Sequence, residues 1–303
     1  MRAGMIGLGR MGGNMARRLG RRGIYVSGFS PNAAARTELA NDGNIEVSNR
    51  IDDMLSALQK PRVVWMMVPA GVATEENVEL LAQRLAPGDI VVDGGNAHYR
   101  DSQRRALLLA GKGIGFVDAG VSGGIWGLEQ GYGLMLGGAR DQVDAIAPLI
   151  HALAPAPDRG WVHCGPPGAG HFVKMIHNGI EYGLMQAYAE GFALLASRPD
   201  LELPLADIAR AWCHGTVIRS WLLELTANAL QDEGALRTVA AQVADSGEGR
   251  WTAQEAIDLG IPIPAINAAL MTRFSSQGAG DFSARLLAML RNAFGGHTLP
   301  PRT

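Results

Sequence analysis

The 303-residue chain has few of the features that mark secreted or membrane proteins. Its two cysteines, Cys164 and Cys213, are too few for a disulfide framework and suit a reducing compartment. Its longest strongly apolar runs, such as 63–68, are far too short to span a bilayer. A strand pattern begins directly after Met1, which leaves no room for a signal peptide. We therefore expect a cytoplasmic protein that does not insert into a membrane.

An excess of charge of either sign is also missing. Lys and Arg number 27 and Asp and Glu number 29, which gives a formal net charge of -2. This balance gives no support for broad electrostatic binding to nucleic acid or to an anionic membrane. An acidic substrate would have to be held by local cations. With 47% hydrophobic and 18% charged residues, the chain is typical of a folded protein long enough for two domains.

Glycine, by contrast, is abundant, with 40 residues, and the first cluster has a recognisable pattern. A short apolar run over 3–6 is followed by Gly7-Leu8-Gly9-Arg10-Met11-Gly12 and then by a helical pattern. In a dinucleotide-binding fold, Gly7 makes the turn, Gly9 lets the pyrophosphate approach, and Gly12 lets helix and strand pack closely. The position of the motif between a strand and a helix predicts a dinucleotide site at residues 7–12.

The end of the second predicted strand, 24–29, bears on the choice of cofactor. NAD enzymes usually place a carboxylate there to bind the ribose 2′-hydroxyl. This chain has Ser30-Pro31-Asn32 instead, and Ser30, Asn32, Arg10 or Arg36 could receive a 2′-phosphate. The sequence therefore favours NADP over NAD. The usual Arg directly after the strand is missing, so both cofactors stay open.

Helices and fully apolar strands alternate up to about residue 153, which is typical of a mostly parallel sheet. A loop rich in Pro and Gly follows between Pro155 and Gly168, and the pattern beyond it is helical. We predict an α/β Rossmann-type doubly wound domain over residues 1–165 and an all-α domain over 166–303. The helices expected in the second domain cover 170–197, 205–229, 233–244, 251–258, 263–275 and 283–294.

Three polar or glycine-containing turns follow predicted strands. They are Val68-Pro69-Ala70 with Gly71, Asn96, and Ser122-Gly123-Gly124. Each alone fits an ordinary tight turn. Ligands of doubly wound sheets bind beyond the carboxyl ends of the strands, so several such turns on one edge favour a binding site there.

The helix predicted over 170–197 carries a candidate acid–base face. Lys174, His177, Asn178 and Glu181 recur at the spacing of one helical face. Such residues often form a solvated surface, but the apolar residues around them predict a largely buried helix. Buried Lys and Glu need partners or a function. The histidines at 151, 163, 171 and 214 have no convincing metal-ligand spacing, so we expect no metal.

Taken with the other motifs, this helix resembles the 6-phosphogluconate dehydrogenase (decarboxylating) family. The matching segments are residues 7–12, Asp93-Gly94-Gly95-Asn96, 118–124, 168–182, 246–252 and 291–297. The length resembles the short-form branch of that family. The resemblance implies oxidative decarboxylation of 6-phosphogluconate to ribulose 5-phosphate and CO2, with hydride transfer to NAD or NADP, as in the pentose phosphate pathway.

The resemblance also implies a role for each matching residue. Lys174 is expected to be the general base, with its pKa lowered by burial or nearby cations, and Glu181 the acid that protonates the enediol. Asn96 and Val68-Pro69-Ala70 are expected to contact the cofactor. The expected substrate contacts fall into three groups. Ser122, Gly123, Gly124, His177 and Asn178 hold the carboxylate and hydroxyls; Tyr182, Arg250 and Arg273 bind the phosphate; Arg291 and His297 reach the site of a partner subunit. A homodimer or a higher homo-oligomer follows from the last pair.

The chain departs from the family pattern at three places. Arg250 stands where the family commonly has Lys, Ser30-Pro31-Asn32 matches neither cofactor pattern, and the surroundings of Arg273 match loosely. A β-hydroxyacid dehydrogenase of the 3-hydroxyisobutyrate or tartronate semialdehyde type is the nearest alternative, but Glu181 and the phosphate cations argue against it. A non-catalytic NADP-binding sensor would be expected to have lost Lys174 or Glu181.

Overall fold

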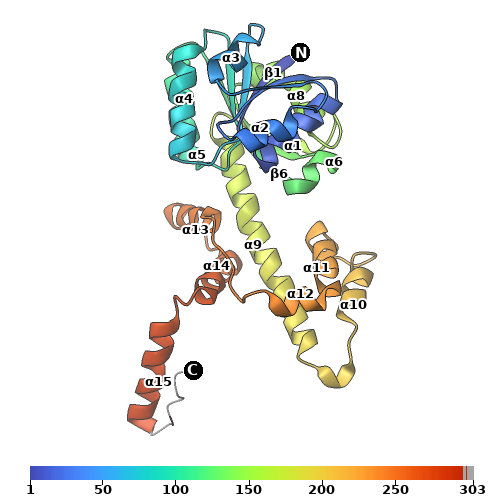
Figure 1. The fold of residues 1–303 in the computed structure, drawn as a ribbon. Coiled ribbons are helices and arrows are strands. Elements are labelled where there is room, and N and C mark those ends of the chain that lie inside the picture. The colour runs from blue at the N-terminus through green and yellow to red at the C-terminus, as the bar shows by residue number, and fades with distance from the viewer. Residues whose placement is uncertain (296–297, 299–303) are drawn as a thin grey trace. The chain divides into compact units, whose positions relative to one another are not determined.

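The computed structural model describes residues 1–295 and 298, without side-chain detail for 233, 294 and 295 (Figure 1). It contains two compact units, Met1–Met175 and Ile176–Thr303. The division falls inside α9 (Ala169–Ala196), which begins in the first unit and continues in the second. The domain limits of 1–165 and 166–303 stay a prediction.

The first unit is built on one eight-stranded sheet with the order β3-β2-β1-β4-β5-β6-β7-β8. Every neighbouring pair is parallel except β6 and β7, which are antiparallel. The order runs outward from β1 in both directions, so the predicted doubly wound, mostly parallel sheet is confirmed. The strands are β1 (Arg2–Ile6), β2 (Tyr25–Phe29), β3 (Ile45–Ser48), β4 (Val63–Met66), β5 (Ile90–Asp93), β6 (Gly115–Ser122), β7 (Gly133–Gly138) and β8 (Trp161–Gly165).

Helices cover both faces of this sheet, so the core consists of two clusters, one on each face. Met15 and Leu19 of α1 pack on one face together with Leu149 of α8. Met54 of α3 and Leu81 of α4 pack on the other face, with α5 beside them. The helices of the unit are α1 (Arg10–Arg21), α2 (Ala33–Leu39), α3 (Ile51–Ser56), α4 (Val72–Arg84), α5 (Tyr99–Ala110), α6 (Gly127–Gln130), α7 (Arg140–Ala145) and α8 (Ala147–Leu153), with a 3-10 turn, η1 (Gly124–Trp126).

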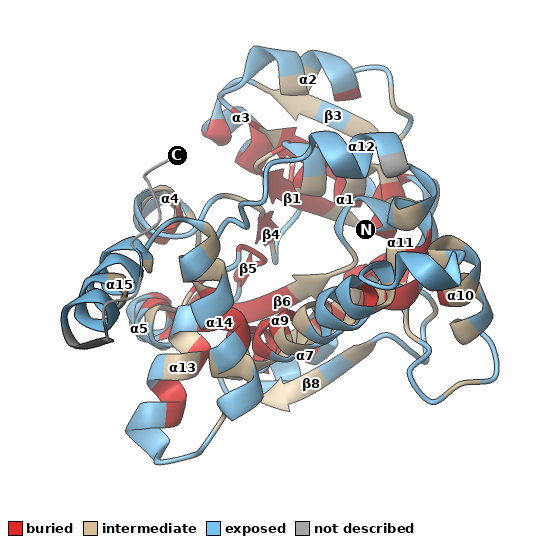
Figure 2. Cartoon of the chain, turned by 90° about the horizontal axis from the view of Figure 1, so that it is seen from below, coloured by how far each residue is buried: buried red, intermediate tan, exposed pale blue. Residues whose placement is uncertain are grey.

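The central strands are apolar because both of their faces are covered. All four residues of β4 and all four of β5 are buried (Figure 2). Their sequences, VVWM and IVVD, lack the alternation of a half-exposed strand, as expected for parallel strands between two helical layers. This arrangement brings the carboxyl ends of β1, β4 and β5 to one edge of the sheet, where the predicted binding turns follow.

The second unit is helical. Phe192, Leu223 and Ala227 form one small core with Trp212, and Tyr182 and Leu270 form another with Phe274. Its elements after α9 are η2 (Pro199–Leu201), α10 (Leu205–Trp212), α11 (Trp221–Gln231), α12 (Glu233–Thr238), α13 (Glu248–Leu259), α14 (Pro264–Ser276) and α15 (Asp281–Gly295). Within the described residues, no helix is both long and apolar enough to cross a membrane.

Several predicted boundaries are wrong for local reasons. The single helix expected over 205–229 is two helices, because Gly215 adopts a positive φ of 74° and the Ser220 side chain caps α11 by accepting from the Leu223 amide. The helix expected over 233–244 ends at Thr238. The loop expected over 155–168 contains strand β8, which the flanking Pro and Gly residues conceal, and the sequence pattern did not predict β3.

Candidate active site

The glycine turn after β1 has the geometry that a dinucleotide requires. Gly7 has a φ of 89°, and its amide donates to the Phe29 carbonyl at 2.9 Å. A side chain at Gly12 would collide with the Gly7 carbonyl, so the glycine permits close packing of α1. Gly9 caps the N-terminus of α1, and apart from its chain neighbours no residue has an atom within 4 Å of where its Cβ would be. The open space over Gly9, at a helix N-terminus, fits a pyrophosphate.

The turn after β2 is fixed by its own side chains. The Asn32 Oδ1 caps α2 by accepting from the Ala34 amide at 2.9 Å. The Ser30 Oγ accepts from the Asn32 amide at 3.3 Å, and Arg36 donates to the Ser30 carbonyl at 2.6 Å. These bonds hold the Arg36 guanidinium at the turn, which has no carboxylate over residues 30–36. Without a carboxylate at this turn, both NAD and NADP stay possible, as the sequence also indicates.

The turn after β5 depends on a buried ion pair that the sequence did not predict. Asp93 Oδ1 accepts from the Gly95 amide at 3.2 Å, and its Oδ2 accepts from Arg105 at 3.0 Å. Both Asp93 and Arg105 have 0% of their side chains exposed. Arg105 also pairs with Glu75 at 2.5 Å, and Glu75 pairs with Arg104 at 2.6 Å. The network connects α4 and α5 to the turn that carries the predicted cofactor residue Asn96.

Two further predicted turns occur on the same sheet. Val68 packs against the core, and the Pro69 carbonyl accepts from the Thr74 hydroxyl at 2.9 Å as α4 begins. Gly123 and Gly124 follow β6 with φ of 118° and 51°, a conformation that other residues rarely adopt. The glycines at this turn are therefore required by the backbone.

Lys174 lies where α9 packs against β6. Lys174 is 8% exposed, and its side chain fills the space beside Gly120. The Asp118 carboxylate accepts from the Gly168 amide at 2.6 Å and from the His171 amide at 2.8 Å. Burial raises the pKa of the Asp118 carboxyl, whereas His171 and the two amides oppose the rise. His171 in turn contacts the Ser102 hydroxyl through Nδ1 at 2.7 Å.

Further along α9, in the second unit, the other predicted polar residues differ in exposure. Asn178 is 9% exposed, while Glu181 lies 3.7 Å from the Nδ1 of His177 and both of these side chains are more than a third exposed. The expectation of a largely buried helix is wrong for this part, because Ile180 and Leu184 are about half exposed.

The predicted phosphate-binding residues lie together in the second unit. The Arg273 guanidinium carbon is 3.4 Å from the centroid of the Tyr182 ring, and Arg273 donates to the Ala244 carbonyl at 3.0 Å. The Arg250 guanidinium carbon lies 4.9 Å from the centroid of the Phe274 ring, and Arg250 pairs with Asp245. Phe274 packs in the same cluster as Tyr182. Arg273, placed by the loosest part of the resemblance, is thus in contact with Tyr182.

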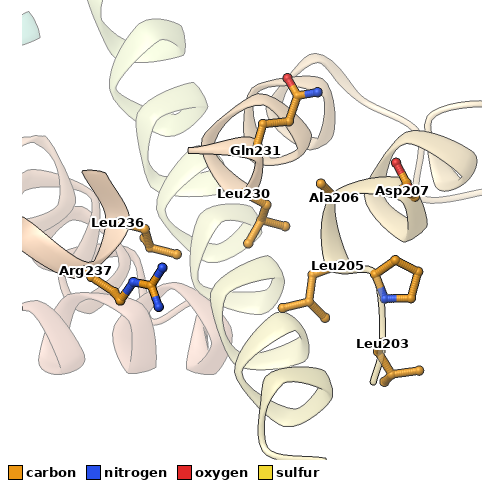
Figure 3. Close-up of a pocket in the computed structure, with 9 residues that line it drawn as sticks. Leu203, Leu205, Ala206, Asp207, Leu230, Gln231, Leu236 and Arg237 are labelled. Atoms are coloured by element: carbon orange, nitrogen blue, oxygen red, sulfur yellow. The ribbon is translucent and has the colours of Figure 1, made fainter. Parts of the chain in front are cut away.

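The remaining predictions concern the tail, metals and cavities. Arg291 is exposed on α15, and His297 lies outside the described residues. Among the residues that the structure describes, no cluster of His, Cys, Asp and Glu could hold a metal. A cavity of about 590 Å³ in the second unit is formed by parts of α10, α11 and α12 (Figure 3). None of the predicted site residues line it, so it is not the candidate active site.

Comparisons with known proteins give matches to both parts of the chain. Residues 2–165 match the family described as the NAD binding domain of 6-phosphogluconate dehydrogenase, and 170–285 match the 6-phosphogluconate dehydrogenase C-terminal domain. An NAD(+)-dependent, decarboxylating 6-phosphogluconate dehydrogenase of Haloferax volcanii is 43% identical over 98% of both chains. A Bacillus subtilis enzyme of the same description is 38% identical over 90% of this chain and 61% of its own.

Among solved structures, 6-phosphogluconate dehydrogenase of Plasmodium falciparum matches all of this chain and 67% of its own, with a TM-score of 0.85 and 28% identity. The agreement covers both the nucleotide-binding and the helical parts, in order along the chain. This chain spans about two thirds of the length of these two longer relatives. The chain therefore belongs to the 6-phosphogluconate dehydrogenase family.

Proposed function

We propose that this protein oxidises and decarboxylates 6-phosphogluconate, giving ribulose 5-phosphate and CO2. The observation that carries the proposal is the 43% identity over 98% of both chains with the Haloferax enzyme. The positions of Lys174 and Glu181 on one continuous helix, seven residues apart, support it. About two helical turns then place a base and an acid on one helical face.

Lys174 acts as the general base. It takes the proton from the hydroxyl on carbon 3, and the hydrogen on that carbon leaves as hydride. The bound nicotinamide cofactor supplies the hydride acceptor. Lys174 is 8% exposed, so few water molecules compete for the hydroxyl proton.

Loss of CO2 follows from the ketone that oxidation creates. The bond between carbons 1 and 2 breaks, and its electron pair moves toward the ketone oxygen to form an enediol. Lys174, now carrying the hydroxyl proton, returns it to the developing enolate oxygen. Glu181 then donates a proton to the former carbon 2 of the substrate, which is carbon 1 of the enediol, and Lys174 takes the enol hydroxyl proton as the ketone of ribulose 5-phosphate forms. The exposure of Glu181, more than a third, gives it access to protons from solvent.

The proposed substrate contacts fall into two groups of residues. Ser122, Gly123 and Gly124, with His177 and Asn178, bind the carboxylate and hydroxyls, and Tyr182, Arg250 and Arg273 bind the phosphate. The association of both arginines with the ring cluster of Tyr182 and Phe274 supports the second group. Local cations of this kind suit a dianionic phosphate in a chain whose net charge is -2.

NADP or NAD is held by the glycine turn at 7–12, Ser30, Asn32, Val68-Pro69-Ala70 and Asn96.

We also propose that the protein is a homodimer or larger homo-oligomer in which Arg291 and His297 reach a neighbouring site. Exposed Phe282, Leu286 and Leu290 on α15, the helix of Arg291, support a covering partner copy. The free cysteines support a cytoplasmic location.

The test of the reaction is the absorbance of reduced nicotinamide with 6-phosphogluconate, run in parallel with NADP and NAD while CO2 is trapped. Reduction matched one-for-one by CO2 is expected. Reduction without CO2 points to a simple β-hydroxyacid dehydrogenase. No reduction with either cofactor contradicts the substrate assignment.

The sharing of Arg291 between subunits has its own test. Chains with Lys174→Met and chains with Arg291→Ala are each expected to be inactive alone. Mixed oligomers are expected to regain activity, because one site then combines Lys174 from one chain with Arg291 from the other. No recovery in demonstrated mixed oligomers contradicts a role for Arg291 across subunits.

A further inference from the structure

The first turn of α9 lies directly on the backbone of β6 and β7. A Cβ on Gly170 would come within 2.7 Å of the Asp118 carbonyl and of the Gly137 amide. A Cβ on Gly137 would come within 2.6 Å of the Gly170 amide. Only glycine permits so close an approach of helix and sheet. The same helix brings Lys174 against Gly120, two residues after Asp118 on β6.

Asp118 holds this crossing together. It is 0% exposed, and its two carboxylate oxygens accept separately from the Gly168 and His171 amides. Amides at a helix N-terminus have no partner within the helix, so the carboxylate caps α9 from a neighbouring strand. Negative charge at this end of a 28-residue helix is also favourable. The cost of burying the charge is thereby offset by two short hydrogen bonds.

His171 adds a second contact in the same turn. His171 is 1% exposed, and its ring contacts Ser102 of α5. His171 precedes Lys174 by three residues, about one turn of the helix. The first turn is therefore fixed on β6 by Asp118 and on α5 by Ser102. The position of the first turn determines the position of Lys174, because the regular geometry of a helix fixes where the next few residues lie.

We propose that Asp118 is a positioning residue, whose carboxylate holds the start of α9 on β6 so that Lys174 reaches the substrate hydroxyl. The inference rests on the proposed function, since it assigns Asp118 a part in placing the general base. Displacement of a catalytic group by about 1 Å can cost about 100-fold in rate.

Asp118→Asn is the first variant to test. An amide offers one oxygen acceptor, whereas Gly168 and His171 both present N–H donors, so one of the two bonds is lost. We expect kcat to fall about 10- to 100-fold, with little change in the Kd of the cofactor. The isotope effect on kcat with substrate deuterated at carbon 3 should rise, because a misplaced base slows the oxidation step itself. A purely structural role would lower the amount of active enzyme and leave the isotope effect unchanged.

Asp89→Asn is the matched control. Asp89 is 1% exposed and also bridges two backbone amides, those of Arg62 and Ala86, at 2.7 and 2.9 Å. It lies just before β5, whereas the candidate site follows the carboxyl ends of the strands. We expect a loss of thermal stability but unchanged kcat and isotope effect. A loss of kcat in Asp89→Asn equal to that in Asp118→Asn would overturn the proposal.

Placement of Lys174 can be read without activity. The chain has three lysines, and Lys60 and Lys112 are exposed, so a protein labelled with 13C at lysine Cε gives few, assignable signals. In Asp118→Asn, the Lys174 signal should move toward those of Lys60 and Lys112. In Asp89→Asn it should not move. An unmoved Lys174 signal in Asp118→Asn contradicts the positioning role of Asp118, whether or not the wild-type protein is active on 6-phosphogluconate. Inactivity of the wild-type protein on 6-phosphogluconate refutes only the proposed function.

If Asp118→Asn fails to fold, Gly170→Ala tests the same crossing, because its Cβ meets rigid backbone of β6 and β7. Gly191→Ala, on the same helix with no atom within 4 Å of the added Cβ, is its control. The Lys174 signal should move only in Gly170→Ala. Equal signals in the two variants would overturn the proposal.

Discussion

Gly120 and Lys174 lie so close that a Cβ on the glycine would come within 3.0 Å of the Cβ of the lysine. The pair joins β6, which leads to the Ser122-Gly123-Gly124 turn, to the helix that carries the proposed base. The absence of a side chain at 120 is therefore a condition for the position of Lys174.

Gly120→Ala is expected to displace Lys174 and lower kcat about 10- to 100-fold, while the Kd of the cofactor stays nearly unchanged. Gly115→Ala on the same strand is the control. Its Cβ would meet Gln142 and Ile90 side-chain atoms at 3.0 and 3.1 Å, far along the strand from Lys174. It should cost similar stability through overpacking. Steady-state kinetics that show equal kcat for the two variants would rule out a special role for Gly120.

Lys174→Met and Glu181→Gln are expected to affect different steps. Without its base, Lys174→Met should lose about 10²–10⁴-fold in oxidation and still bind the cofactor. Glu181→Gln should form reduced nicotinamide in a rapid first turnover and then release ribulose 5-phosphate slowly. Stopped-flow absorbance combined with product assay separates the two steps. Small and equal effects of both substitutions would contradict the acid–base assignment.

Arg18 holds the end of α1 to two other helices of the first unit. It is 4% exposed and donates to the carbonyls of Leu128, Glu129, Ala152, Leu153 and Ala154. Arg18→Met leaves these carbonyls without the donor, so we expect a loss of about 3 kcal/mol or more in the free energy of unfolding. Arg21→Met removes an exposed ion pair with Glu129 and should cost less than about 1 kcal/mol. Urea denaturation of both variants makes the comparison, and similar midpoints would contradict the role given to Arg18.

Glu75 makes the first unit sensitive to acid. The Arg104 guanidinium, assisted by Arg105, holds the pKa of Glu75 below its ordinary value against the opposing effect of partial burial. A depressed carboxyl pKa stabilises the folded state above the unfolded value of about 4.3, and this stability is lost as pH falls through the folded pKa. Glu75→Gln should therefore lower Tm at pH 7 and have a smaller effect at about pH 3.

Glu46→Gln provides the matched control for Glu75. Glu46 pairs with Arg2 at 3.4 Å but is 63% exposed, so its loss should change Tm little at either pH. A deficit in Tm for Glu75→Gln that stays the same from pH 7 to about pH 3 would contradict the assignment of the acid sensitivity to this carboxylate.

The features predicted from sequence are those with a local pattern. The glycine turn at 7–12, the alternation of helices and apolar strands, and the long helix from about 170 follow from residues that are neighbours in the chain. The helix is observed over Ala169–Ala196, close to the predicted 170–197. A Cβ on Gly170 would meet the backbone of β6 and β7, whereas a Cβ on Gly168 would meet Tyr99 and Gln103 of α5.

The features that were missed depend on partners distant in the chain. Asp118 contacts an amide 50 residues away, Arg18 binds carbonyls more than 100 residues away, and Arg105 pairs with Glu75 across 30 residues. Local periodicity does not contain such contacts. The break between α10 and α11 was missed for a different reason, since apolar residues continue through it and only Gly215 and Ser220 mark the turn.

Arg273 offers a test of the proposed phosphate site. Arg273→Met keeps an apolar chain beside Tyr182 and removes the guanidinium, which lies 3.4 Å from the ring centroid. Loss of a charged contact to phosphate should lower kcat/KM for 6-phosphogluconate about 10- to 100-fold, mainly through KM. The same variant should process unphosphorylated gluconate as slowly as the wild-type protein does, because that substrate has no phosphate to bind.

Arg198→Met is the control, since it removes an arginine paired with Asp200 at 2.6 Å on the surface. It should leave kcat/KM unchanged for both the phosphorylated and the unphosphorylated acid. If Arg273→Met lowers kcat/KM equally for the phosphorylated and unphosphorylated acids, Arg273 supports the fold of the second unit rather than the phosphate, and Arg250 is left as the principal phosphate cation on this chain.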